Sequence, residues 1–318
     1  MTLDCRCLRY NEAVNILPLI NDPAFVQQAE FAIHEFCKEV GEITYIEHGS
    51  DNVVALVNKQ YVFHFPRSAD AARRLAFEAA LLQRIGKQIH SIRVPLIAKL
   101  QMRPLYVVSE YIEGEHLQNE RIQSLSTDEQ VAVGRALASF MVELTQSVSS
   151  LEVQRLRREA GADSTRQAWD AYFEGLFVTM PLPNEKLRPI VAEYYGIWKN
   201  YVAQEQRTLT VHDDLHANNL LFSGPQLTGI VDFKDANVGS IEEEMRWLFA
   251  MGDTVLGSAI DQYQSLTGTQ VNKDHVRIWV IVQQLASFIK RFEAEETSSP
   301  HFLRAQHYLR AWIPNFPL

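Results

Sequence analysis

The polar residues that follow residue 211 have the types and the spacing that phosphoryl transfer requires. Transfer to a hydroxyl needs a carboxylate that orients the hydroxyl and accepts its proton. It also needs an amide oxygen and a second carboxylate, the hard ligands that Mg²⁺ prefers beside nucleotide phosphates. The sequence reads His212-Asp213-Asp214-Leu215-His216-Ala217-Asn218-Asn219, and Ile230-Val231-Asp232-Phe233 follows a second apolar run. This H-x-D-x-x-x-x-N spacing predicts Asp214 as the base and Asn219 and Asp232 as Mg²⁺ ligands.

Asp and Asn side chains also form turns in ordinary loops, so His-x-Asp alone has little weight. Four polar types in the right order, followed by an apolar hairpin that ends in Asp-Phe, favour the catalytic interpretation. We expect His212 to brace the loop through hydrogen bonds and His216 to lie at its surface. Asp213 is either a solvated carboxylate or part of the wall of an acceptor pocket.

The first part of the chain has the pattern of a small antiparallel sheet. We expect helices within residues 10–40, strands at 43–46, 53–57, 61–65, 94–101 and 105–112, and a helix from about 69 to 86. The order β-β-β-α-β-β suits an antiparallel meander with one inserted helix.

The rest of the chain is mainly helical. Residues 114–126 read as a connector, and Ser126 and Glu129 form a capping box that begins a helix. Further helices are expected at about 164–179, 187–205, 242–266, 272–294 and 299–312, and the only strands at 209–212, 219–223 and 228–233. The change of pattern near residue 114 predicts two domains, 1–113 for nucleotide and 114–318 for the catalytic loop and the acceptor.

The composition is that of a folded soluble protein, with 47% hydrophobic and 22% charged residues among 318. The net charge is −9 without a basic block, so we expect no nucleic-acid partner and a cationic or neutral small ligand. The three cysteines, Cys5, Cys7 and Cys37, are too few for a disulfide framework. No apolar run is long enough to cross a membrane. We expect a cytoplasmic monomer.

The catalytic stretch resembles the HGDLHPGN-type loop of the aminoglycoside phosphotransferase family, small-molecule kinases with a protein-kinase-like fold. Tyr61-Val62-Phe63-His64-Phe65-Pro66-Arg67 is similar to the F-[KR]-F-P-[KR] strand of its 2″-phosphotransferase branch, and the likeness covers roughly residues 30–270. The resemblance implies an α+β, bilobal fold with five strands in its N-terminal lobe, and ATP or GTP with Mg²⁺. It implies nucleotide-binding roles for a set of residues in the first domain: Ser50, His64, Glu78, Ser109, Tyr111 and Ile112.

Of the positions that depart from the family pattern, two concern the charge near the nucleotide phosphates. His64 stands on the third strand where the family has Lys, the fixed positive charge on the α- and β-phosphates. An imidazolium beside Glu78 would replace that charge in part, whereas a neutral imidazole would not. Lys234 follows Asp-Phe where the family usually has Gly, and its side chain either reaches phosphate or lies at the surface.

Carboxylates are frequent after Asp232, and they have two interpretations. They are either exposed side chains on solvated helix faces, or some of them, Asp235 and Glu242 included, join Asp213 in lining a cleft for a cationic sugar. The leading acceptor is therefore an aminoglycoside. The alternatives are another acceptor, such as choline, homoserine, a fructosamine or a macrolide, or a nucleotide-binding protein that has lost turnover.

Overall fold

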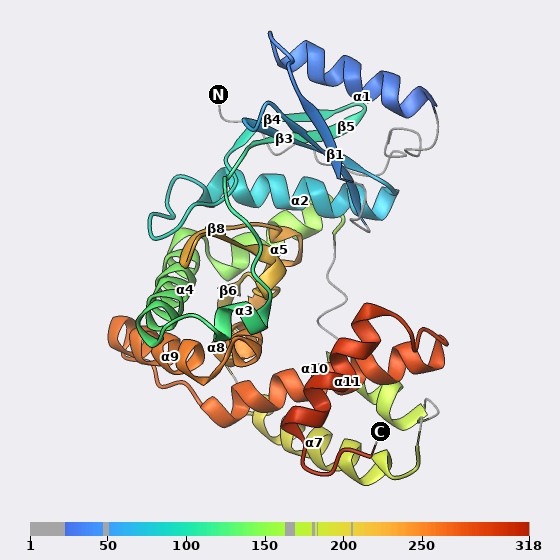
Figure 1. Ribbon diagram of the computed structural model, residues 1–318, viewed down its shortest axis with the longest axis vertical. Helices are drawn as coiled ribbons and strands as arrows, with labels where there is room; N and C mark the ends of the chain where they lie inside the picture. The colour runs from blue at the N-terminus through green and yellow to red at the C-terminus, as the bar shows by residue number, and fades with distance from the viewer. Residues whose placement is uncertain are drawn as a thin grey trace.

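The computed structural model describes residues 23–46, 51–162, 169–179, 182, 184–204 and 206–317. A β-rich N-terminal part precedes a mostly helical part (Figure 1), which confirms the expected α+β class. Ser50, Cys5 and Cys7 fall outside the described residues. None of the described helices combines the length and the apolarity that crossing a membrane requires.

The N-terminal sheet has five antiparallel strands in the order β1-β2-β3-β5-β4. The strands are β1 (Ile43–Ile46), β2 (Asn52–Val57), β3 (Tyr61–Pro66), β4 (Ile97–Met102) and β5 (Leu105–Glu110). Each lies within three residues of the expected bounds. Alternation of apolar residues fixes the register, because successive side chains point to opposite faces. His64 on β3 is thereby placed between Val54 and Val107.

Two helices cover the two faces of this sheet (Figure 1). Helix α1 (Pro23–Phe36) packs on the face that carries Phe63 and Phe65, and the Phe25 and Phe65 rings meet edge to face. Helix α2 (Ala69–Ile85) lies against Val107 on the other face, which is also the face of His64. Its first turn is capped by Ser68, whose hydroxyl accepts from the N–H of Ala71 at 3.1 Å.

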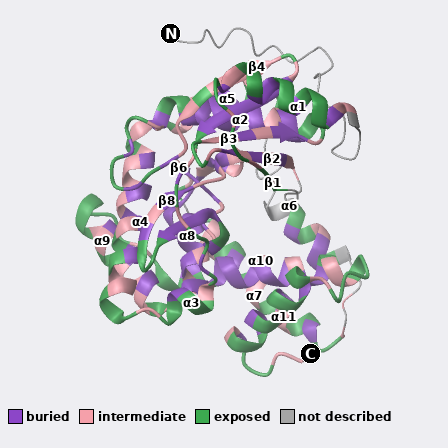
Figure 2. Ribbon diagram, turned by 45° about the horizontal axis from the view of Figure 1, so that its top comes forward, coloured by how far each residue is buried: buried purple, intermediate pink, exposed green. Residues whose placement is uncertain are grey.

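Helix α2 also belongs to the main core of the helical part. Its Phe77 and Leu81 share one buried apolar cluster with Leu137 and Phe140. Figure 2 shows buried stretches, in purple, both on α2 and on the helices of the second part. The helices that follow are α3 (Asn119–Gln123), α4 (Thr127–Ser147), α5 (Ser150–Ala160), α6 (Trp169–Glu174), α7 (Leu187–Val202), α8 (Ile241–Met245), α9 (Asp253–Thr267), α10 (Lys273–Glu293) and α11 (Pro300–Trp312). A second buried cluster joins α7, α10 and α11.

Several expectations for the helical part need correction. The connector contains the short helix α3, the expected list lacks α5, and a π turn (Gly175–Thr179) ends the helix expected over 164–179. The helix expected over 242–266 is divided by a 3-10 segment, η6 (Arg246–Met251), because Gly252 adopts a φ of 111° that a helix cannot continue. The capping box of Ser126 and Glu129 is present, as predicted, and begins α4.

Short strands position the catalytic segment. Strands β7 (Leu220–Ser223) and β8 (Gln226–Ile230) form the expected hairpin through Gly224, whose φ is 58°. Strand β6 (Leu209–Val211) pairs with β9 (Asn237–Gly239), a fourth strand that the sequence analysis did not predict. A strand of three residues is too short to show an alternating pattern in the sequence. Its pairing partner is also distant, since Val238 of β9 pairs with Thr210 of β6, 28 residues earlier.

The crossing of α4 and α9 generates a stability prediction. A Cβ on Gly134 of α4 would lie 2.3 Å from the Val255 carbonyl oxygen, whereas a Cβ on Gly196 of α7 would meet nothing within 4 Å. Gly134→Ala should therefore lower the free energy of unfolding by about 1–3 kcal/mol or more, through overpacking. Gly196→Ala should raise it by about 0.5–1 kcal/mol, because the unfolded chain loses freedom. Urea unfolding of both variants measures this, and a neutral Gly134→Ala would contradict the close approach.

Candidate active site

The catalytic loop begins directly after β6 with His212, whose side chain is 0% exposed. The Nδ1 atom of His212 accepts from the N–H of Asp214 at 3.3 Å, so the proton lies on Nε2, which donates to the Val231 carbonyl at 3.1 Å. Burial lowers the pKa of His212 to about 4, which keeps the imidazole neutral. The two bonds tie the loop to the chain just before Asp232. The predicted bracing role of His212 is confirmed.

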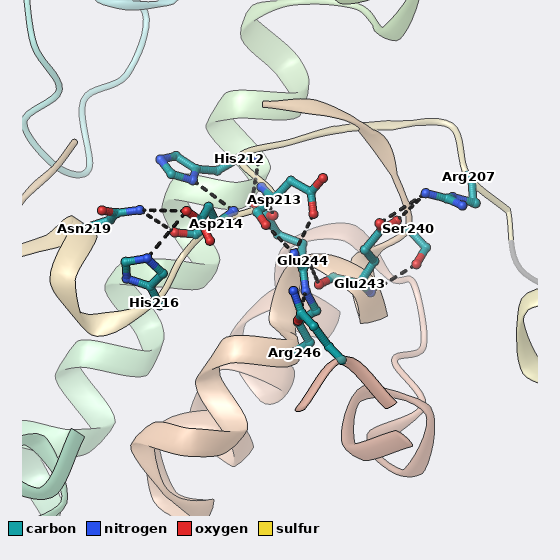
Figure 3. A network of polar contacts seen from close by, with 11 residues as sticks. Arg207, His212, Asp213, Asp214, His216, Asn219, Ser240, Glu243, Glu244 and Arg246 are labelled. Atoms are coloured by element: carbon teal, nitrogen blue, oxygen red, sulfur yellow. Dashed lines mark hydrogen bonds and ion pairs between the residues drawn. The ribbon is translucent and has the colours of Figure 1, made fainter. Parts of the chain in front are cut away.

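Asp214 and Asn219 lie side by side in the loop (Figure 3). The amide nitrogen of Asn219 donates to the Asp214 carbonyl at 2.8 Å and lies 3.4 Å from its Oδ2 atom. The amide oxygen of Asn219 points away from Asp214 (Figure 3). His216 is not merely a surface residue, because its Nε2 lies 3.5 Å from Asp214 Oδ2 and its ring meets Trp247 edge to face.

Asp213 does not line an acceptor pocket, which corrects that interpretation. Its side chain is 1% exposed, and its Oδ1 lies 2.7 Å from the guanidinium of Arg246, a residue that is itself fully buried. Arg246 also donates to the Asp213 carbonyl. The backbone of Asp213 has a φ of 67°, a left-handed conformation in which the family loop carries Gly. The ion pair holds this conformation next to Asp214.

The neighbouring acids are structural as well (Figure 3). Glu244 is buried, and its two oxygens accept from the N–H groups of His212 and Asp213, each at 2.8 Å. Glu243 is 0% exposed and accepts from Arg207 at 2.9 Å. The dense run of glutamates at the start of α8 therefore fastens the catalytic loop, and these two carboxylates are unavailable to an acceptor.

The second carboxylate of the motif, Asp232, ends the segment after β8 with a φ of 68°. Burial raises the pKa of Asp232, and the ammonium of Lys234, which pairs with its Oδ2, opposes this. Lys234 is only 18% exposed, so it is not a solvated surface lysine. Burial lowers the pKa of Lys234, but Asp232, Asp235 and Glu78 outweigh it and raise the pKa above its ordinary value.

Glu78 of α2 contacts the same segment. Its Oε1 accepts from the N–H of Phe233 at 2.7 Å. Burial, and then the nearby carboxylate of Asp232, raises the pKa of Glu78 to about 8. Glu78 therefore links α2 to the segment that carries Asp232.

His64 does not supply the positive charge that the family has on the third strand. Burial, and then the charge of Lys234, lowers the pKa of His64 to about 4. An imidazolium beside Glu78 is therefore excluded near pH 7, since the folded protein keeps His64 neutral.

The segment expected against the purine continues from β5. Ser109 is buried and pairs with Val62 of β3. The N–H of Tyr111 donates to the Gln60 carbonyl at 2.8 Å, and the Arg93 guanidinium lies 3.4 Å from the Tyr111 carbonyl. These contacts occupy the N–H and the carbonyl of Tyr111, and the next residue, Ile112, is buried.

The donor set suits Mg²⁺. Mg²⁺ in nucleotide sites takes one or two protein carboxylates and completes its shell with phosphate and water. Asp232 offers a carboxylate that already pairs with one cation, Lys234, and Asn219 offers the amide oxygen that points away from Asp214. Within the described residues, no group of three or more His, Cys, Asp or Glu could hold a metal by itself, which is consistent with this sparse set.

The two remaining acceptor candidates differ in placement. Asp235 follows Lys234 in the 3-10 turn η5 (Phe233–Asp235), and its charge acts on both Glu78 and Lys234. Glu242 accepts from the N–H of Asn272 at 3.1 Å, at the start of α10. Asp235 is thus near the metal ligands, whereas Glu242 joins α8 to α10.

Sequence reasoning missed Arg246 altogether. A signal was available, because Arg246 is a lone cation within the apolar run Met245–Met251 that follows three glutamates. A buried arginine needs such partners, since an unpaired buried charge is costly.

The Asp213–Arg246 pair generates a prediction about stability. Arg246→Met should lower the free energy of unfolding by about 3–5 kcal/mol, because it leaves the Asp213 carboxylate buried without its cation. The double variant Asp213→Gly with Arg246→Met should recover at least half of that loss, since Gly tolerates the φ of 67°. Urea unfolding of the four proteins in a double-mutant cycle measures the coupling. Additive effects would contradict a direct interaction.

Comparison with solved structures identifies the fold. The chain superposes on an aminoglycoside 2″-phosphotransferase of type IIIa in complex with GDP and kanamycin at a TM-score of 0.73 and 20% identity, covering 90% of this chain and 98% of the other. A 2″-phosphotransferase of type IIa with streptomycin and ATP gives 0.64 and 19%, covering 88% and 97%. A macrolide 2′-phosphotransferase from Brachybacterium faecium gives 0.64 and 16%, covering 91% and 98%.

These likenesses confirm the protein-kinase-like fold that the resemblance implied. The sequence model of the phosphotransferase enzyme family matches residues 42–278. That span runs from the first strand of the sheet into α10 and contains every residue of the catalytic loop. The chain belongs to the phosphotransferase enzyme family of which the aminoglycoside phosphotransferases are members.

Proposed function

We propose that this protein transfers the γ-phosphoryl group of ATP or GTP to a hydroxyl of a small molecule. The observation that carries the proposal is the fixed arrangement of Asp214 and Asn219. The backbone of their loop donates to the buried carboxylate of Glu244, and the His212 side chain of the loop donates to the Val231 carbonyl, just before Asp232. Such positioning is most of what catalysis of phosphoryl transfer requires.

In the proposed reaction, Asp214 orients the acceptor hydroxyl and takes its proton. The hydroxyl oxygen forms a bond to the γ-phosphorus while the bond from that phosphorus to the β-phosphate oxygen breaks, so ADP or GDP leaves. Asn219 and Asp232 would hold Mg²⁺, which neutralises charge on the phosphate oxygens. Residues 1–113 would bind the nucleotide, with Ser109, Tyr111 and Ile112 along the base, and residues 114–318 would carry the catalytic loop and the acceptor.

Two acceptor classes are supported by different observations. An aminoglycoside is favoured by the net charge of −9, by Asp235 near the metal ligands and by the similarity to 2″-phosphotransferases. A macrolide is the second candidate. The similarity to the macrolide enzyme is comparable, and three acids expected to attract a polycation, Asp213, Glu243 and Glu244, are buried in structural contacts.

Substitution of the proposed base tests the reaction. Asp214→Asn should lower kcat by about 10²–10⁴-fold, because the amide cannot accept the proton. The affinity for nucleotide should change by less than about threefold, since the substitution leaves the other nucleotide contacts in place. Turnover is measured by coupled release of ADP or GDP, and nucleotide affinity by calorimetry. Asp261→Asn, on the exposed side of α9, is the matched control and should keep wild-type turnover. Near-normal kcat in Asp214→Asn would overturn the assignment.

A panel of acceptors distinguishes the two classes. With Asp214→Asn as the blank, kanamycin and gentamicin should give a higher kcat/KM than a macrolide, choline or homoserine. A macrolide as the best acceptor would transfer the assignment to that class. Nucleotide binding without turnover on any acceptor would favour a binding protein.

A further inference from the structure

The nucleotide site lacks a cation on β3, and a different residue occupies the corresponding environment. In kinase-type transfer, a lysine bound to the helix acid and close to the metal-binding aspartate contacts the nucleotide phosphates. Here the helix acid is Glu78 and the aspartate is Asp232. The ammonium that pairs with Asp232 belongs to Lys234, which directly follows Phe233, the residue whose N–H donates to Glu78.

Lys234 lies where three segments meet. Its ammonium pairs with Asp232 and is 3.9 Å from Oδ2 of Asp51, the residue directly before β2. Glu78 approaches from α2 and accepts from the N–H of the preceding residue, Phe233. The ammonium thus lies between Asp51 and Asp232, and Glu78 of α2 binds the backbone one residue before Lys234.

Hydrogen bonds from Arg157 fix the backbone at Lys234 and just after it. The guanidinium of Arg157 donates to the carbonyls of Lys234 at 3.1 Å and Ala236 at 2.8 Å, and it stacks on the ring of Phe77. Because the backbone is fixed, movement of the ammonium is confined to its four-carbon stem. This length allows the ammonium to leave Asp232 for a phosphate oxygen without any change in the backbone.

We infer that Lys234 binds the phosphates of the nucleotide and takes the place of the lysine that β3 lacks. This inference rests on the proposed function. It assigns the charge to the segment after β8 instead of to β3, where His64 stands. Arg74, another cation close to Asp51, is already paired with Asp51 at 2.9 Å and with Asp70 at 3.3 Å.

The competing explanation is that Lys234 only neutralises Asp232 in the folded protein. The two explanations differ in what the side chain recognises. If Lys234 binds phosphate, its substitution weakens the binding of a nucleoside triphosphate and leaves the affinity for the corresponding nucleoside unchanged. If Lys234 has only a structural role, its substitution changes both affinities equally or changes neither of them.

The test compares Lys234→Met and Lys234→Arg with the control Lys87→Met, at an exposed position after α2. Calorimetry gives the Kd for ATP, GTP, adenosine and guanosine, with and without Mg²⁺, and thermal melts check folding. Lys234→Met should weaken triphosphate binding at least tenfold and change nucleoside binding less than twofold. Lys234→Arg should retain most of the affinity, and Lys87→Met all of it.

A relocated charge provides a second measurement. His64→Lys combined with Lys234→Met returns the cation to β3 and should recover at least fivefold of the lost triphosphate affinity. A folded double variant without recovery would contradict the claim that both positions serve the same phosphates.

The outcomes separate this inference from the function on which it rests. Wild-type protein that binds neither ATP nor GTP would overturn both. Wild-type protein that binds and transfers, with Lys234→Met indistinguishable from it, would overturn the role of Lys234 alone. Equal losses for nucleoside and triphosphate would also overturn that role, because they would indicate a structural effect.

Discussion

The catalytic loop depends on the carboxylate of Glu244. The loop that carries the proposed base Asp214 and the proposed metal ligand Asn219 has no regular structure before its short 3-10 turn (Ala217–Asn219), so its first backbone N–H groups need other partners. Glu244 provides one carboxylate for the N–H groups of both His212 and Asp213. Arg246 follows two residues later and holds both the carbonyl and the side chain of Asp213. One short segment, α8 with the start of η6, thus fixes the residues that precede the base.

The same principle operates in the segment that follows β8. The turn that carries Asp232 is held by Glu78 from α2 and by Arg157 from α5, each through backbone groups. Charged side chains inside the protein are costly unless they are paired and hydrogen-bonded. Here pairing and hydrogen bonds offset that cost, and they also hold Asp213 and Asp232 at φ of 67° and 68°, conformations that L-residues rarely adopt. The buried ions therefore serve geometry more than stability.

Sequence reasoning predicted the features that depend on residues close together in the sequence. Alternating apolar residues located all five strands of the sheet, and the capping box located the start of α4. The H-x-D-x-x-x-x-N spacing brought Asp214 and Asn219 together as the structure has them. It failed where a residue's role depends on a partner distant in sequence. Asp213 was interpreted as a solvated carboxylate or an acceptor contact, because no residue close to it in the sequence indicates its pairing with Arg246, 33 residues later. Strand β9 failed for the same reason, since its three residues are ordered only by pairing with β6.

Helix α2 has a consequence for control of the enzyme. It buries one side against the sheet and another against α4, and eleven of its seventeen residues, Glu78 among them, are buried. In many signalling kinases the helix that carries this acid swings outward to silence the enzyme. An outward swing here would expose side chains such as Phe77 and Leu81, at about 1.5–3 kcal/mol each. Helix α2 is thus fixed by its packing, which keeps Glu78 at the backbone of Phe233 instead of letting it move outward.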